Sequence, residues 1–246
     1  MTAPVFVVEH LDAGGGGRYV LDGPEGRHAV SVKRLRAGED VVLTDGAGRW
    51  ADCVVLDTEG KDRLILRLDS VHEEPVERPR VTVVQALPKG DRGELAVETM
   101  TEVGVDAIVP WAAARCITQW KGDRGAKALG KWRATAREAG KQSRRVRFPE
   151  VAEAATTKQV ASLLAGAEFA AVLHESGDTP LATAELPATG EIVLVVGPEG
   201  GVAPEELALF EEAGAQAYRL GRSVLRTSTA GTAAAAVLLA RTGRWS

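Results

Sequence analysis

The chain has 246 residues, enough for one large or two small domains, and its 45% apolar and 26% charged residues exclude a disordered or fibrous protein. The longest uncharged apolar run, residues 232–240, is too short to span a membrane, and the N-terminus lacks the pattern of a signal peptide, so we expect a cytoplasmic protein. The net charge of −4 is an average that hides a strong asymmetry along the chain. The two cysteines, Cys53 and Cys116, are widely separated and give no zinc site.

Residues 1–73 consist of short β-type runs separated by turn signals, which predicts a small β-barrel. The runs are residues 5–8, 18–21, 41–44, 50–56 and 64–68, with turns at 14–17, 45–46 and 59–60. One helical interruption is expected, because Ala29, Val32 and Leu35 recur at three-residue spacing.

Two basic runs stand out in a chain that is otherwise acidic. Between residues 27 and 36 there is no acid, and the basic side chains are Arg27, His28, Lys33, Arg34 and Arg36. Residues 121–147 contain ten Lys or Arg against two acids, so this run carries +8 and the rest of the chain −12. Either run alone could be a solvated helix face. Their concentration in two places favours nucleic acid as the partner.

From residue 80 onward strands alternate with helices, which predicts an α/β domain with a largely parallel sheet. Strands are expected at residues 81–87, 107–111, 169–174, 192–196 and 217–220. Helices are expected at residues 91–103, within the larger basic run, around 159–164, and at 204–213 and 228–241. Residues 73–79, with two prolines and four charges, are predicted to link this domain (residues 80–246) to the first (residues 1–73).

Two of the predicted strands end in segments whose residues suit ligand binding or catalysis. The strand at 192–196 runs into residues 197–201 (GPEGG), whose three glycines allow the backbone to approach a ligand. Their spacing fits neither a dinucleotide fingerprint nor a P-loop, so a nucleoside-like ligand without a buried pyrophosphate suits the segment better. A plain strand-to-helix turn is the alternative. The strand at 169–174 ends in His174, and a lone histidine there is more often structural than catalytic. The other histidines are too far away in sequence to suggest a metal site or a triad.

A third segment, residues 220–229 (LGRSVLRTST), joins a strand to the last helix. Thr227 or Ser228 can cap this helix. Arg226 lies where the first amides and the helix dipole already favour an anion, so it could stabilise negative charge on a substrate or simply be a surface arginine.

In this order the segments resemble the RsmE family of 16S ribosomal RNA uracil-N3 methyltransferases, within the SPOUT superfamily. The resemblance extends through most of the chain, beyond residues 197–201 and 220–227. The further blocks are residues 27–40 (RHAVSVKRLRAGED), 87–91 (LPKGD), 101–104 (TEVG) and 132–143 (WRATAREAGKQS).

The resemblance implies an N-terminal PUA-like β-barrel and a C-terminal SPOUT α/β methyltransferase domain whose end forms a trefoil knot. It also implies a homodimer that acts on 16S rRNA in the small ribosomal subunit, without a metal. S-adenosylmethionine would bind to the knot loops. The cofactor-binding residues carried over are Leu173, His174, Gly197, Pro198, Glu199, Gly200, Gly201, Leu220, Gly221, Ser223, Leu225, Arg226 and Thr227.

For the catalytic step we hypothesise that Arg226 stabilises the developing uracil anion. The proton acceptor stays open among Glu199, His174, Thr227 and bulk water. The residues expected to contact RNA phosphates are Arg27, Lys33, Arg34, Arg36, Lys131, Arg133, Arg137, Lys141, Arg144 and Arg145. Two alternatives remain, a SPOUT enzyme that modifies transfer RNA and a non-catalytic RNA-binding protein.

Overall fold

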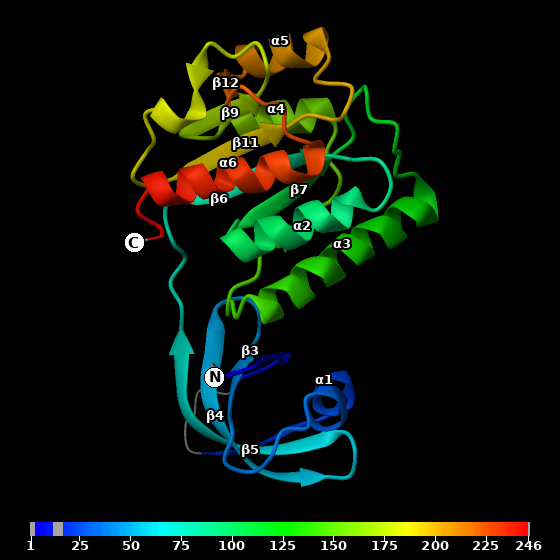
Figure 1. Cartoon of the computed structure of the whole chain (residues 1–246), viewed down its shortest axis with the longest axis vertical. Helices are drawn as coiled ribbons and strands as arrows, with labels where there is room; N and C mark the ends of the chain where they lie inside the picture. The colour runs from blue at the N-terminus through cyan, green and yellow to red at the C-terminus, as the bar shows by residue number, and fades with distance from the viewer. Residues whose placement is uncertain (1–2, 12–16, 246) are drawn as a thin grey trace. The chain divides into compact units, whose positions relative to one another are not determined.

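The computed structural model describes residues 3–11 and 17–245 and divides into two compact units (Figure 1). One unit consists of Met1–Val76 together with Gly140–Phe148, and the other of Glu77–Ala139 and Pro149–Ser246. The glycine turn expected at residues 14–17 lies, apart from Gly17, outside the described residues.

The first unit is built on a five-stranded sheet that curls around its own core. In sheet order the strands are β1 (Val5–Val7), β3 (Asp40–Thr44), β4 (Arg49–Glu59), β5 (Arg63–Glu73) and β2 (Arg18–Leu21). Two register shifts between β4 and β5 mark irregularities of the kind that bend a strand pair. The sheet order leaves β1 and β2 as edges, so the described strands form an open half-barrel, and the predicted strands are all present with β4 and β5 longer than expected.

The helical interruption forms between β2 and β3, but earlier and in a different geometry than predicted. It starts with α1 (Gly23–Arg27), which has Pro24 in its first turn, and continues as a π-helix, η1 (His28–Val32). Ala29 is fully buried, whereas Val32 is 66% exposed. The wider π-helical turn breaks the three-residue spacing, so the predicted apolar stripe is wrong at Val32.

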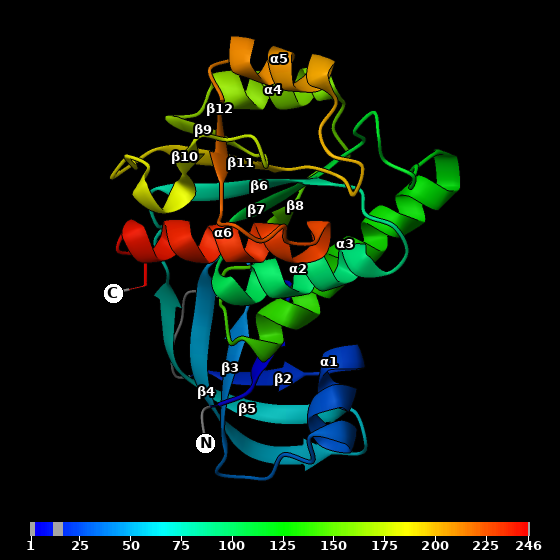
Figure 2. The same cartoon turned by 45° about the horizontal axis from the view of Figure 1, so that its top comes forward.

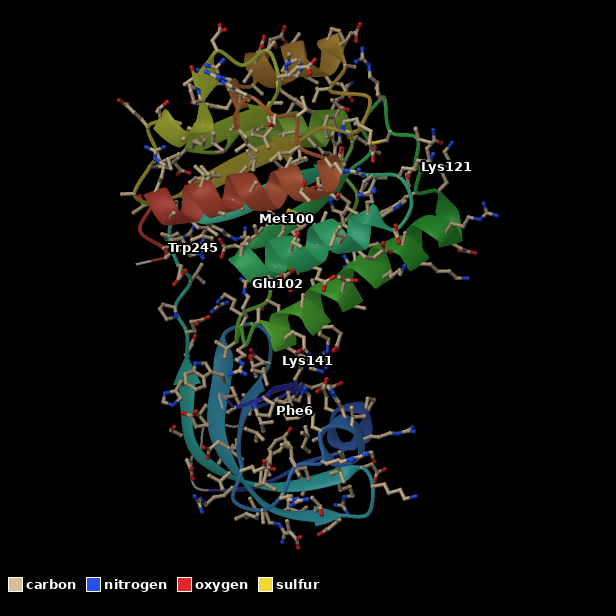
Figure 3. The ribbon with its side chains drawn as sticks, in the orientation of Figure 1. Phe6, Met100, Glu102, Lys121, Lys141 and Trp245 are labelled. Carbon is tan, nitrogen blue, oxygen red and sulfur yellow. The ribbon has the colours of Figure 1, made fainter. Side chains whose placement is uncertain are left out.

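Gly140–Phe148 belongs to the first unit although it lies far along the chain. The Phe148 N–H donates to the Gly46 carbonyl at 2.8 Å. Lys141 (Figure 3) binds the Glu25 carboxylate at 2.9 Å, and only 5% and 13% of these two side chains are exposed. The end of the larger basic run is therefore partly built into the half-barrel.

The second unit contains a seven-stranded sheet in which every neighbouring pair is parallel. In sheet order the strands are β10 (Thr179–Pro180), β12 (Gln216–Arg219), β9 (Phe169–Leu173), β11 (Glu191–Val196), β6 (Arg80–Ala86), β7 (Ala107–Trp111) and β8 (Glu150–Val151). Helices cover both faces of the central strands, which explains their continuous apolar sequences. The two-residue strands β8 and β10 are too short to show such a pattern and were not predicted.

The helices of this unit divide between the two faces of its sheet (Figure 2). On one face lie α2 (Arg92–Val103), α6 (Thr227–Arg241) and α3 (Gly122–Gln142), the last through Leu129 and Trp132. On the other lie α4 (Thr157–Ala165) and α5 (Pro204–Glu212). A short 3-10 helix, η2 (Leu181–Thr183), follows β10. The five predicted helices are confirmed with ends shifted by a few residues.

Small residues of α6 allow it to approach α2 closely. A Cβ atom at Gly231 would lie 2.8 Å from the Met100 sulfur, and Ala234 and Ala235 are fully buried. Close packing therefore contributes to the alanine-rich composition of this helix, in addition to good helix propensity.

The last residues of the chain are tied to the start of the second unit. The Arg244 guanidinium binds the Asp106 carboxylate through two N–H groups and also reaches Glu77 and the Pro79 carbonyl. The side chains of Arg244 and Asp106 are 8% and 9% exposed. This is a buried, multiply hydrogen-bonded ion pair between residues that are far apart in sequence.

Both cysteines are free thiols. Burial raises the pKa of Cys53 to about 12 and also raises the pKa of Cys116, so both stay protonated at neutral pH.

Among the described helices none is long and apolar enough to cross a membrane. The expected trefoil knot stays a prediction.

Candidate active site

The carboxyl ends of the parallel strands gather the predicted site segments at one edge of the second sheet. His174 follows β9, Gly197 follows β11 and Leu220 follows β12. Because these three strands are neighbours and run in the same direction, their following loops lie together.

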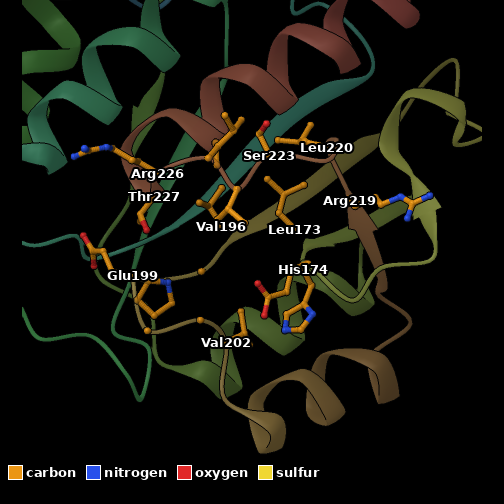
Figure 4. Close-up of a pocket in the computed structure, with 18 of the residues that line it drawn as sticks. Leu173, His174, Val196, Glu199, Val202, Arg219, Leu220, Ser223, Arg226 and Thr227 are labelled. Carbon is orange, nitrogen blue, oxygen red and sulfur yellow. The ribbon is translucent and has the colours of Figure 1, made fainter.

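The loops enclose a cavity of about 660 Å³ (Figure 4). All thirteen residues predicted to bind the cofactor line it. Leu173, Val196 and Leu220 lie around its centre, so the middle of the cavity is apolar while the surrounding loops present backbone groups and charges. Such a lining suits a flat heterocycle with a polar extension.

The cavity lies near the point in the sheet where successive helices pass to opposite faces. From β6 the chain continues to α2 on one face, whereas from the neighbouring β11 it continues to α5 on the opposite face. Loops that diverge in this way leave a crevice between them. The Lys89 N–H donates to Glu199 Oε1 at 3.1 Å, which connects the two loops.

The glycine segment after β11 needs its glycines for steric reasons. Gly201 has a φ of 74°, in the left-handed region. A Cβ atom at Gly197 would lie 2.8 Å from a Val202 methyl group, and one at Gly200 would lie 3.3 Å from the Arg115 side chain. The glycines are therefore required by the packing of Val202 and Arg115 against this segment, and the approach of its backbone to a ligand stays a prediction.

A buried carboxylate, that of Glu206 in the first turn of α5, joins the end of the loop after β11 to the loop after β7 and to the start of α4. Only 6% of Glu206 is exposed. Its Oε1 accepts hydrogen bonds from the Ala114 N–H at 2.8 Å and the Thr157 hydroxyl at 2.9 Å, and its Oε2 accepts one from the Ala203 N–H. Sequence reasoning missed this residue, although an acid three positions after a helix N-cap is a known signal.

We expect Glu206→Ala to lower the free energy of unfolding by about 3 kcal/mol, because it leaves three donors without their acceptor. Affinity for S-adenosylmethionine should fall by roughly tenfold, because the bonded residues Ala114 and Ala203 adjoin Arg115 and Val202, which line the cavity. Thermal unfolding and calorimetric titration measure the two effects. Glu205→Ala is the matched control, because Glu205 is exposed in the same helical turn, and equal effects of the two variants would contradict the assignment.

The start of α6 differs in one detail from the prediction. Arg226 is the N-cap and Thr227 the first helical residue, and neither Thr227 nor Ser228 caps the helix through its side chain. The Thr227 carbonyl accepts a hydrogen bond from Nε2 of the buried Gln85 at 3.3 Å, which is a separate contact and not a cap. The position of Arg226 at the helix N-terminus is as predicted.

Two other titratable side chains line the cavity, His174 and Tyr218. The Ser176 N–H donates to His174 Nδ1 at 3.2 Å, so in a neutral ring the proton resides on Nε2. Burial raises the pKa of Tyr218, which therefore stays a neutral phenol at physiological pH.

The residues predicted to bind RNA divide between the two units. In the first unit Arg27, Lys33, Arg34 and Arg36 are exposed. Of the larger run, the structure places Lys131, Arg133 and Arg137 on α3 in the second unit and Lys141, Arg144 and Arg145 in the first.

Members of the larger run already have partners in the protein, among them Lys131, Arg133 and Lys141. Lys131 pairs with Glu94 and stays exposed, and Arg133 pairs with Glu153. Lys141 is a correction to the prediction: its ammonium group is buried against Glu25, so it is not presented to a phosphate.

Two arginines that line the cavity come from outside the segments predicted to form it, Arg92 at the start of α2 and Arg115 after β7. Arg115 donates from Nη1 to the Gly200 carbonyl at 3.0 Å. Each is a single arginine in a stretch of sequence without a motif, so only the fold reveals that both face the same site.

Comparison with known proteins gives a consistent result. The protein-family model for the RNA methyltransferase domain matches residues 75–239. The family model for the RNA methyltransferase PUA domain matches residues 21–69. Ribosomal RNA small subunit methyltransferase E of Mycobacterium bovis is 46% identical over 100% of this chain and 94% of its own. The protein of the same name from Bacillus subtilis is 29% identical over 86% of each chain.

Solved structures agree over nearly the full length. Ribosomal RNA small subunit methyltransferase E of Neisseria gonorrhoeae, bound to S-adenosylmethionine, has a TM-score of 0.83 at 28% identity, covering 98% of both chains. A putative methyltransferase of Legionella pneumophila in complex with the same cofactor has a TM-score of 0.83 at 27% identity, again over 98% of both. The chain therefore belongs to the RNA methyltransferase family, with a PUA-like domain preceding a SPOUT methyltransferase domain.

Proposed function

We propose that this protein transfers a methyl group from S-adenosylmethionine to N3 of a uracil in the 16S rRNA of the small ribosomal subunit. The observation that carries the proposal is the convergence of all thirteen predicted cofactor residues on one cavity. It is supported by relatives that carry the name of a small-subunit rRNA methyltransferase and by similar structures that hold S-adenosylmethionine.

The residues of the cavity fit this cofactor. Leu173, Val196 and Leu220 offer apolar contacts for an adenine ring, and the glycine segment brings backbone N–H and C=O groups within reach of its edge. When bound, S-adenosylmethionine supplies an electrophilic methyl group on a positively charged sulfur. The protein then has to align a nucleophile with that methyl group.

Arg226 is proposed to assist the nucleophile. Uracil N3 attacks well only as its proton leaves, which puts negative charge on the base, and a guanidinium at the N-terminus of α6 stabilises that charge. His174 and Thr227 are unsuited to accept the proton, the first because Nδ1 is occupied and the second because an alcohol is a weak base. The acceptor is therefore Glu199 or solvent water. Because N3 lies on the pairing edge, the target base must be unpaired or flipped out.

The exposed arginines and lysine of the half-barrel, Arg27, Lys33, Arg34 and Arg36, are proposed to bind RNA phosphates. Replacing all four with glutamine should weaken RNA binding and lower the slope of log K against log salt concentration by roughly 0.7 to 0.9 for each phosphate that the protein no longer neutralises. Fluorescence anisotropy with an RNA fragment at several salt concentrations measures this slope. An unchanged slope would show that these four residues do not contact RNA phosphates.

The proposed reaction is tested by transfer of labelled methyl from S-adenosylmethionine to small ribosomal subunits that lack the modification, with transfer RNA in parallel and nucleoside analysis of both. We expect 3-methyluridine from the subunits alone. Label only in transfer RNA would assign the protein to a different substrate, and RNA binding without any label would indicate a non-catalytic RNA-binding protein. The homodimer implied by the family resemblance stays a prediction, which light scattering of the purified protein checks.

A further inference from the structure

The charges that line the cavity are not those that its cofactor requires. Five arginines and two glutamates line it, a formal surplus of three positive charges. They are Arg92, Arg115, Arg219, Arg222, Arg226, Glu175 and Glu199. The chain as a whole carries −4, so this surplus is local to the site.

S-adenosylmethionine does not neutralise such a surplus. It carries a positive sulfonium and a positive ammonium against one carboxylate, so it brings a further positive charge into the cavity. One arginine can pair with the carboxylate. The remaining positive charges repel the cofactor unless an anion binds beside it.

Three of the arginines gather at the same edge of the cavity. Arg115 reaches the Gly200 carbonyl, next to Glu199. Arg92 begins the helix that follows the Lys89 loop, and that loop is bonded to Glu199. Figure 4 shows Arg226 on the same side as Glu199, with Arg219 on the opposite side.

The guanidinium groups at this edge have hydrogen-bonding capacity to spare. Within residues 3–11 and 17–245, the side chains of Arg92 and Arg226 make no hydrogen bond or ion pair, and Arg115 uses a single N–H for Gly200. The acids nearest Arg92 in sequence do not neutralise it at the cavity. Asp91 does not line the cavity, and Glu94 is paired with Lys131.

We propose that Arg92 and Arg115 form a phosphate subsite that holds the RNA backbone next to the target base. The proposal rests on the proposed function in that the substrate is RNA. A base that is flipped into the cavity remains joined to the phosphates on either side of it, so these must lie at the cavity rim. Arginine is the side chain best suited to them, because its planar fork bonds two phosphate oxygens at once. Arg226 then acts on the base and the other two arginines on the backbone.

Arg92 gives the sharper test, because replacing Arg115 would also release Gly200. We expect Arg92→Gln to raise KM for the RNA substrate by roughly tenfold. It should also reduce the magnitude of the slope of log K for RNA binding against log salt concentration by about 0.7. The dissociation constant of S-adenosylmethionine should not change. Arg92→Lys should recover part of the affinity, because it restores the charge without the fork. Lys158→Gln is the matched control, since Lys158 is an exposed cation on α4, which does not line the cavity.

The measurements are RNA anisotropy at several salt concentrations, calorimetry with S-adenosylmethionine, and steady-state methyl transfer. An Arg92→Gln protein with unchanged RNA binding and KM would overturn the subsite while wild-type methylation upheld the proposed function. A loss of cofactor affinity in place of RNA affinity would also overturn it, because Arg92 would then bind the cofactor carboxylate. If the wild type bound RNA without methylating it, the proposed function would fail and the salt slope would still decide the subsite.

Discussion

Arg226→Ala is expected to lower kcat for methyl transfer on the order of 100- to 1000-fold, the usual effect of removing one group that stabilises a developing anion. Arg226 lines the cavity at the N-terminus of α6, and its guanidinium makes no bond to the protein within the described part of the chain. Its removal therefore breaks no hydrogen bond or ion pair of that side chain. Single-turnover methyl transfer with saturating cofactor and RNA isolates this step.

The comparison variant is Arg226→Lys, which keeps the positive charge and should recover part of the rate. Binding of S-adenosylmethionine and the unfolding temperature should be close to those of the wild type in both variants. Full turnover by Arg226→Ala would contradict the catalytic role. A rate loss that followed a loss of cofactor affinity would assign Arg226 to cofactor binding instead.

The second large effect concerns stability. Arg244→Ala is expected to lower the free energy of unfolding by about 3 to 5 kcal/mol, because it leaves the Asp106 carboxylate buried without its counter-charge. Asp106 also accepts a hydrogen bond from the Val81 N–H at the start of β6, so the damage should extend to the sheet. Denaturant unfolding of the full-length protein, followed by circular dichroism, measures the change.

An exposed ion pair of the same unit provides the control. Lys131 pairs with Glu94 at 2.8 Å, but 65% of its side chain is exposed. Lys131→Ala should therefore change the free energy of unfolding by less than about 1 kcal/mol. Equal losses in the two variants would mean that burial does not set the strength of these pairs.

Much of the second unit could be predicted because its signals are local. Strands buried on both faces have continuous apolar sequences, and a glycine segment after such a strand marks a ligand-binding loop in the chain itself. The parallel direction of the strands then placed His174, Gly197 and Leu220 at one edge. All thirteen expected lining residues followed from these few rules and the family resemblance.

The residues that escaped prediction depend on contacts between distant segments. In the sequence Glu206 is one of several acids near the start of a predicted helix. Its partners Ala114 and Thr157 lie far away in sequence. Arg92 and Arg115 have no local pattern. Lys141 looked like one cation among many because the sequence does not show that Glu25 lies opposite it. Burial and pairing across the fold cannot be read from periodicity.

The membership of Gly140–Phe148 in the first unit has a consequence for biosynthesis. A nascent chain that has emerged only as far as the linker lacks residues 140–148. In the finished half-barrel these residues bind Gly46 and Glu25. Domains usually fold in order as they leave the ribosome. Here the N-terminal one can be completed only after more than half of the polypeptide has been made, so its maturation is coupled to synthesis of the catalytic domain.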